Sequence, residues 1–66
     1  MEITLNGATR TIPAQTSASD LIESLGLAGQ RLALEVNREI VPRSTFSEHM
    51  IRPGDTVEIV RAIGGG

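Results

Sequence analysis

Apolar and polar residues alternate along several short stretches of this chain, a pattern typical of strands with one buried face. The clearest examples are Met1–Leu5 and Arg31–Asn37, in which every second residue is a large apolar one. Two shorter stretches, 9–12 and 39–41, are each followed by a proline, which cannot donate a hydrogen bond to a sheet ladder. All four stretches are therefore predicted to be strands.

Turn signals separate these strands. Asn6 and Gly7 are the strongest short-range signal for a tight hairpin, because both residues tolerate the positive φ of a type I′ turn. A second turn is predicted around Asn37 and Arg38, where the Asn37 side chain is expected to bond the backbone. A third is predicted at Arg52–Asp55, with proline in the second position, where its fixed φ fits.

One helix is predicted between the second and third strands. Ser17 and Asp20 resemble a capping box, with Asp in place of the usual Glu or Gln. The apolar residues that follow fall on one stripe at helical spacing and are expected to pack on a sheet: Ala18, Leu21, Ile22 and Leu25. Gly26 suits the position just after the helix ends.

The segment 44–50 is ambiguous. Ser44 or Thr45 could cap a single helical turn that places Phe46 and Met50 on one side. Further on, Asp55 is expected to be a turn residue.

The last strand is predicted from Thr56 to Ile63 and carries apolar residues on both faces, with Glu58 as a solvated charge. Apolarity on both faces indicates an interior strand, often a parallel one. The order of elements then predicts an α+β protein with the ubiquitin-like β-grasp fold: a mixed five-stranded sheet with one main helix packed on one face. Residues 1–63 would form this domain, and 64–66 would be a flexible glycine tail leaving the middle of the sheet.

Length and composition narrow the possible functions. A domain of 66 residues buries roughly 60% of its unfolded surface, which leaves no room for a deep active site. The chain has no cysteine, so disulfides, thiolate metal sites and a thiol nucleophile are excluded. We therefore expect a small module that presents a surface or an end to larger partners.

Charge and targeting signals argue against nucleic-acid binding and against a membrane or secreted location. The net charge is −2, the arginines are scattered and Phe46 is the only aromatic residue, so nucleic-acid binding is not expected. No stretch is apolar enough to cross a membrane, and the first residues do not resemble a signal peptide. A cytoplasmic location is the simplest expectation.

Three glycines, Gly64, Gly65 and Gly66, follow the last predicted strand directly. Because glycine has no Cβ, such a segment can take backbone angles that are closed to other residues and can enter a narrow slot in another protein. A frayed end is the alternative interpretation. The abrupt change from an apolar strand to glycine favours a functional role.

At this point the sequence resembles a known family. The matching parts, in order, are Val36–Arg43, Phe46, Pro53–Val60 and Gly64–Gly66. Together with the opening strand and the length, they are similar to ThiS, the sulfur carrier family of thiazole formation in thiamine biosynthesis. The resemblance covers nearly the whole chain.

The resemblance implies a specific chemistry. A ThiF-like adenylyltransferase of the E1 type, using ATP and magnesium, would adenylate the carboxylate of Gly66. Sulfur from a cysteine desulfurase persulfide would then displace AMP and leave a thiocarboxylate on Gly66, which would donate its sulfur to thiazole synthase (ThiG-like). Gly64 and Gly65 would enter the partner's active site. The chain itself would have no catalytic residue, metal or bound cofactor, and would be a protein co-substrate rather than an enzyme.

Three residues before the glycines are candidates for partner docking: Arg61, Ala62 and Ile63. Solvation of Arg61 and packing of the other two within the sheet are the competing interpretations. Other functions also remain open: a MoaD-like carrier for molybdopterin synthesis, a ubiquitin-like modifier joined to lysines of other proteins, and a β-grasp binding module that needs no free glycine end.

Overall fold

Five strands and one α-helix make up the part of the chain that the computed structural model describes, residues 1–61. The elements are β1 (Glu2–Leu5), β2 (Ala8–Thr11), α1 (Ala18–Ser24), β3 (Leu32–Val36), β4 (Glu39–Val41), the short 3₁₀ helix η1 (Arg43–Thr45) and β5 (Thr56–Arg61). The predicted order of strands and helix is confirmed. The predicted end of the last strand, the domain boundary and the glycine tail, all within 62–66, lie outside the described residues.

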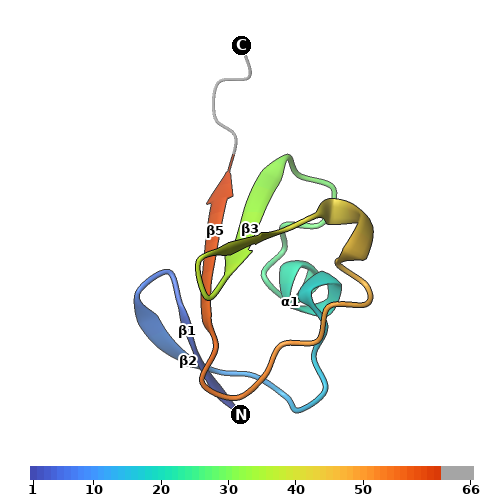
Figure 1. Cartoon of the computed structure of the whole chain (residues 1–66). Helices are drawn as coiled ribbons and strands as arrows, with labels where there is room; N and C mark the ends of the chain where they lie inside the picture. The colour runs from blue at the N-terminus through green and yellow to red at the C-terminus, as the bar shows by residue number, and fades with distance from the viewer. Residues whose placement is uncertain (62–66) are drawn as a thin grey trace.

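The strands form one mixed sheet in the order β2-β1-β5-β3-β4 (Figure 1). β5 lies in the centre, where it pairs in parallel with β1 and antiparallel with β3. The pairing with β3 is the longer, running from Leu32 opposite Arg61 to Val36 opposite Val57. The predicted interior strand and the predicted β-grasp fold are therefore confirmed.

The two hairpin turns both use left-handed backbone. Asn6 and Gly7 have φ of 49° and 84°, as the predicted type I′ turn requires. Asn37 and Arg38 have φ of 53° and 70°. The left-handed conformation strains Arg38 by roughly 1–2 kcal/mol. An arginine at this position therefore does not predict a left-handed turn.

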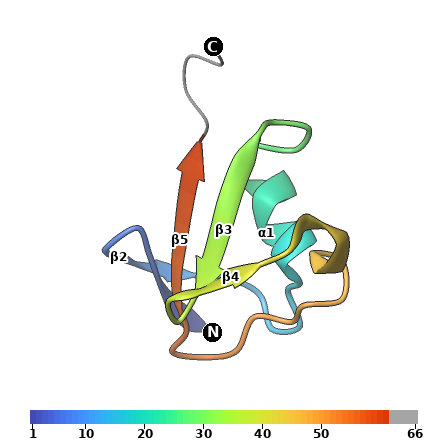
Figure 2. The ribbon, with the colours of Figure 1, turned by 45° about the horizontal axis from the view of Figure 1, so that its top comes forward.

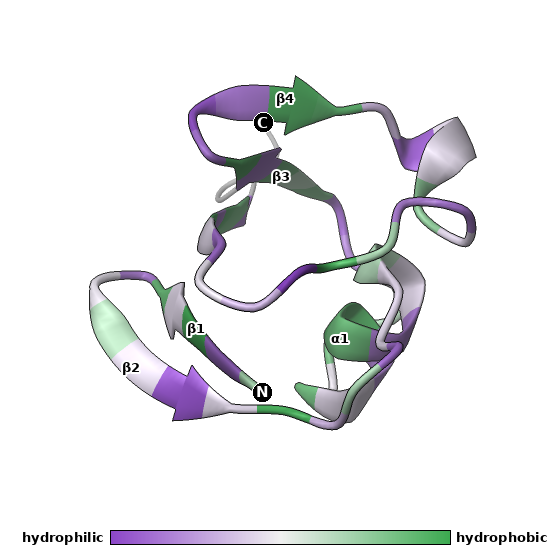
Figure 3. Cartoon of the chain, turned by 60° about the horizontal axis from the view of Figure 1, so that its bottom comes forward, coloured by the Kyte–Doolittle hydropathy of each residue, from purple (hydrophilic) through white to green (hydrophobic). Residues whose placement is uncertain are grey.

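The core lies between α1 and one face of the curved sheet (Figures 1 and 2). Ala18, Leu21 and Ile22 of α1 are buried against apolar side chains of the strands, as the helical stripe predicts. Leu25, the last residue of the stripe, is only partly buried. The strands contribute Ile3, Leu5, Leu34, Val36, Val41 and Val57. Figure 3 shows the apolar segments of β1 and α1, in green, on facing elements.

The start of α1 is fully hydrogen-bonded, although the first turn of a helix has no partners of its own. The predicted capping box is present: Asp20 N donates to Ser17 Oγ at 3.0 Å, and Ser17 N donates to Asp20 Oδ2 at 3.2 Å. The N–H groups of Ala18 and Ser19 donate to carbonyls of the later segment, at His49 and Phe46. The helix start therefore also fixes the segment 46–49.

The ambiguous segment 44–50 differs from the prediction. The helical turn begins directly after Pro42, as η1, and no side chain caps it. Thr45 instead donates its hydroxyl to the Pro42 carbonyl at 2.9 Å. The predicted capping by Ser44 or Thr45 is therefore wrong. The segment is held instead by backbone bonds of its own, such as that from His49 N to the Thr45 carbonyl, and by the two bonds that α1 donates to it.

Candidate functional site

The C-terminal end of β5 is the described feature nearest to the glycines. Arg61, its last residue, is exposed and lies opposite Leu32 of β3. In Figures 1 and 2 this end of β5 points away from the N-terminus and lies at the opposite end of the sheet, although β5 itself is the central strand. Whatever follows Arg61 therefore starts from the central strand.

Asn6 extends the contact of β1 with β5 beyond the paired residues. The parallel pairing ends at Leu5 opposite Val57, and Asn6 N then donates to the Val57 carbonyl at 2.9 Å. One step further, Ile59 N donates to the side-chain oxygen Asn6 Oδ1 at 2.8 Å. The sequence predicts only the turn role of Asn6, because nothing near it in the chain indicates a partner 53 residues away.

Asn37 holds the other end of β5. Thr56 N donates to Asn37 Oδ1 at 3.0 Å, and Asn37 Nδ2 donates to Asp55 Oδ1 at the same distance. Asp55 also accepts a hydrogen bond from Arg52 N at 2.8 Å, within the predicted turn. The turn role predicted for Asp55 is confirmed. Asn37 lies in the predicted turn and its side chain bonds a backbone N–H, but that N–H belongs to Thr56 of β5 rather than to the turn itself. Together the two residues fix where β5 begins.

The face of the sheet opposite α1 carries two exposed apolar side chains, one near the end of β5 and one on the edge strand β4. Val60 is 62% exposed and lies opposite Ala33 of β3, and Ile40 of β4 is 72% exposed. The apolarity of β5 on both faces thus includes a residue that is not buried in this chain. Single exposed apolar residues are common on protein surfaces, and Val60 is of interest here because it directly precedes Arg61 at the end of β5.

Two carboxylates lie on neighbouring strands, directly opposite each other, on the face of the sheet that also carries Val60. Glu58 is exposed, as predicted, but the register places it directly opposite Glu35 of β3. Like charges in this position destabilise a sheet by up to about 1 kcal/mol. The sequence does not indicate this pair, because it depends on the register of two strands far apart in the chain.

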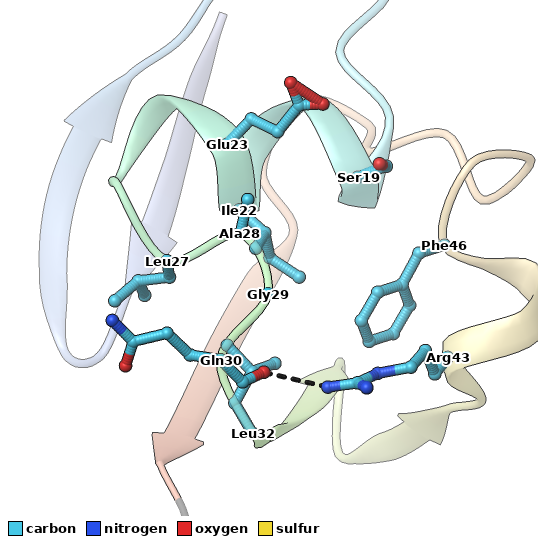
Figure 4. Close-up of a pocket in the computed structure, with 10 residues that line it drawn as sticks. All are labelled: Ser19, Ile22, Glu23, Leu27, Ala28, Gly29, Gln30, Leu32, Arg43 and Phe46. Carbon is cyan, nitrogen blue, oxygen red and sulfur yellow. Dashed lines mark hydrogen bonds between the residues drawn. The ribbon is translucent and has the colours of Figure 1, made fainter.

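A small cavity of about 260 Å³ lies between α1, the following loop and η1 (Figure 4). Its apolar lining comes from Ile22, Leu27, Leu32 and Phe46. Arg43 closes one side by donating from its guanidinium to the Gln30 carbonyl at 2.8 Å. The lining contains no nucleophile paired with a base, so the cavity does not have the arrangement of a catalytic site.

Within residues 1–61, no group of three or more His, Asp or Glu side chains could hold a metal ion. No helix in this part of the chain has the length and apolarity needed to cross a membrane.

Comparison with known proteins adds the decisive observation. The model of the ThiS family matches residues 3–66, which includes the glycines. The chain belongs to the ThiS family.

The relatives of this ThiS-family chain include proteins named as sulfur carriers and proteins named as thiazole synthases. It is 30% identical to the sulfur carrier protein ThiS of Escherichia coli over the full length of both. It is 38% identical to a thiazole synthase of Paramagnetospirillum magneticum, of which it spans only 20% of the length. The crystal structure of the thiamine biosynthesis protein ThiS from Geobacter metallireducens superposes on the whole chain with a TM-score of 0.86 at 29% identity.

The predicted site residues divide into two groups. Arg61 is described, and it is exposed at the end of the central strand. Ala62, Ile63, Gly64, Gly65 and Gly66 lie outside the described residues. The structure adds Asn6 and Val60 next to this end of β5.

Proposed function

We propose that this ThiS-family chain is a sulfur carrier in thiamine biosynthesis. The carboxylate of Gly66 would be adenylated and converted to a thiocarboxylate, which would donate its sulfur to a thiazole synthase. The observation that carries the proposal is the ThiS family match, which extends through the glycines. The identity of 38% with a thiazole synthase supports the choice of acceptor.

The chemistry needs little from the carrier itself. A terminal carboxylate has a reference pKa of about 3.3–3.7, so it is ionised at neutral pH and can attack the α-phosphorus of ATP. Pyrophosphate leaves, and AMP then becomes the leaving group when sulfur attacks the carbonyl carbon. A ThiF-like adenylyltransferase would bind ATP and magnesium and stabilise the charge that develops. A cysteine desulfurase would supply the sulfur as a persulfide, whose outer sulfur displaces AMP to give an acyl disulfide. A thiol would then reduce the S–S bond and release the thiocarboxylate. The cytoplasm, where ATP is available, is the proposed location.

Docking would use the end of β5. We propose that the exposed side chains of Val60 and Arg61, together with Ala62 and Ile63, contact the adenylyltransferase while Gly64 and Gly65 lead Gly66 into its active site. Three extended residues span at most about 10–11 Å, which is enough to enter a site while the domain stays outside.

A Val60→Thr variant should bind the adenylyltransferase several-fold more weakly, because losing apolar contact area costs about 25 cal/mol per Å². Threonine keeps the β-branched shape, so the fold should be retained. Ile40→Thr, which changes an exposed apolar residue two strands away, is the matched control and should bind normally. Titration calorimetry measures both affinities. Equal affinities for Val60→Thr and the unchanged chain would exclude Val60 from the interface.

The proposal is tested by the intact mass of the 66-residue chain after incubation with ATP, magnesium, a ThiF-type enzyme and sulfide. We expect one oxygen of the chain to be replaced by sulfur, with fragmentation placing the change at Gly66. Addition of a thiazole synthase together with its small-molecule substrates, which take up the sulfur, should then return the carboxylate. A folded chain that stays unmodified beside an active enzyme would contradict the carrier function. A thiocarboxylate that thiazole synthase does not consume would indicate another acceptor.

A further inference from the structure

We infer that Asn6 is a positioning residue for the carrier reaction. Its side-chain amide fixes the part of β5 from which the chain continues toward Gly66. The inference rests on the proposed function, because it assigns Asn6 a role in presenting the carboxylate to the adenylyltransferase.

The contacts of β5 are uneven on its two sides. On the β3 side, backbone pairing continues to Arg61. On the β1 side it stops at Val57, because β1 ends and the chain turns at Asn6. The bond from Ile59 N to Asn6 Oδ1, at 2.8 Å, is the last described tie of β5 on this side. The Asn6 side chain therefore accepts a hydrogen bond from β5 at a position where the backbone of β1 no longer pairs with it.

Asparagine is suited to this position for two reasons. It tolerates the left-handed backbone of the turn, where its φ is 49°. Its amide oxygen is also an acceptor close to its own backbone, and it accepts the N–H of Ile59 while the Asn6 backbone N–H is bonded to Val57. Glycine would keep the turn and lose the acceptor, whereas aspartate would keep both.

The position of this bond connects it to the reaction. Ile59 is two residues before Arg61, so loss of this bond would leave all of 59–61 held on the β3 side only. A displacement of about 1 Å at a reacting group can cost on the order of 10²-fold in rate. Loss of the Asn6 amide should therefore affect the chemical step more than it affects the fold.

Asn37 provides a matched control within the same sheet. It also sits in a hairpin turn with positive φ, 53°, and its Oδ1 also accepts a backbone N–H of β5, that of Thr56 at 3.0 Å. It holds the start of β5 rather than its end, and it makes an additional bond to Asp55. Asn37→Gly should thus lose at least as many hydrogen bonds as Asn6→Gly, at the end of β5 remote from Gly66.

The experiment compares Asn6→Gly, Asn6→Asp and Asn37→Gly with the unchanged chain. The readouts are thermal stability, amide hydrogen exchange of Ile59 and Val60, and kcat and KM for adenylation by a ThiF-type enzyme. We expect Asn6→Gly to lower kcat roughly 10-fold, within the range for a displaced reacting group, and to speed exchange at both amides. Asn6→Asp should restore most of kcat. Asn37→Gly should lose at least as much thermal stability as Asn6→Gly, while its kcat and the two exchange rates stay near those of the unchanged chain.

Two results would overturn the inference. One is an equal loss of kcat in Asn6→Gly and Asn37→Gly, which would attribute the effect to stability alone. The other is faster exchange at Ile59 with unchanged kcat, which would make Asn6 purely structural. An unchanged chain that folds but is never adenylated would instead contradict the proposed function, so the two failures are distinguishable.

Discussion

Replacing Gly65 by alanine should leave the domain folded and slow the adenylation of Gly66 by on the order of 10²-fold. In the proposed complex the glycines enter a narrow active site, where a Cβ would contact the walls and displace the carboxylate from the ATP α-phosphorus. The domain itself should be unaffected, because Gly65 follows the last described strand residue, Arg61. The measurement is the single-turnover rate of AMP-adduct formation, with a denaturation curve recorded on the same sample.

Gly54→Ala is the control for this experiment. Gly54 precedes β5 at the end remote from Gly66 and has a φ of +82°, although an added Cβ would meet nothing within 4 Å. Alanine there is strained by roughly 1–2 kcal/mol. The control should therefore be less stable than Gly65→Ala and yet react at the normal rate. Normal turnover of a folded Gly65→Ala chain would refute the idea of a narrow slot.

Replacing Leu21 by alanine should remove a large share of the stability of the domain. Leu21 is fully buried, with 0% exposure, at the centre of the apolar stripe of α1. Such a truncation costs about 2–5 kcal/mol, and a domain of 66 residues has only roughly 3–10 kcal/mol of stability in total. Urea denaturation followed by circular dichroism measures the loss.

Leu27→Ala is the matched comparison for Leu21. Leu27 is only partly buried and lines the small cavity rather than the core centre. Its truncation should cost about 1 kcal/mol, in proportion to the smaller area withdrawn from water. If both variants lost the same stability, the core would not be centred on α1 as described.

Local motifs account for most of the fold that could be predicted from the sequence. The capping box of Ser17 and Asp20 and the turn at Asn6 and Gly7 each depend on residues within four positions of one another. The central place of β5 followed from its apolar residues on both faces. One of them, Val60, proved to be exposed, so the pattern reflected a surface as well as an interior strand.

The rest depends on contacts between distant segments. The bond between Asn6 and Ile59 and the opposition of Glu35 and Glu58 arise only when the register of the sheet is set. The bonds that α1 donates to the carbonyls of Phe46 and His49 also join distant segments, and no local signal indicates them. For the candidate site, the glycines stand out in the sequence, but the contacts that would give them a role belong to a partner protein.

The central position of β5 has a consequence for how the domain forms. β1 with β2 and β3 with β4 are two hairpins that share no strand pairing until residues 56–61 come between them. An isolated hairpin is marginally stable at best in water, and pairings between distant segments form slowly because loops must close first. A nascent chain that has emerged only through β4 therefore has no complete sheet. The sheet can therefore close only after residues 56–61 have been made, and a chain that stops short of them lacks the central strand from which the proposed site continues.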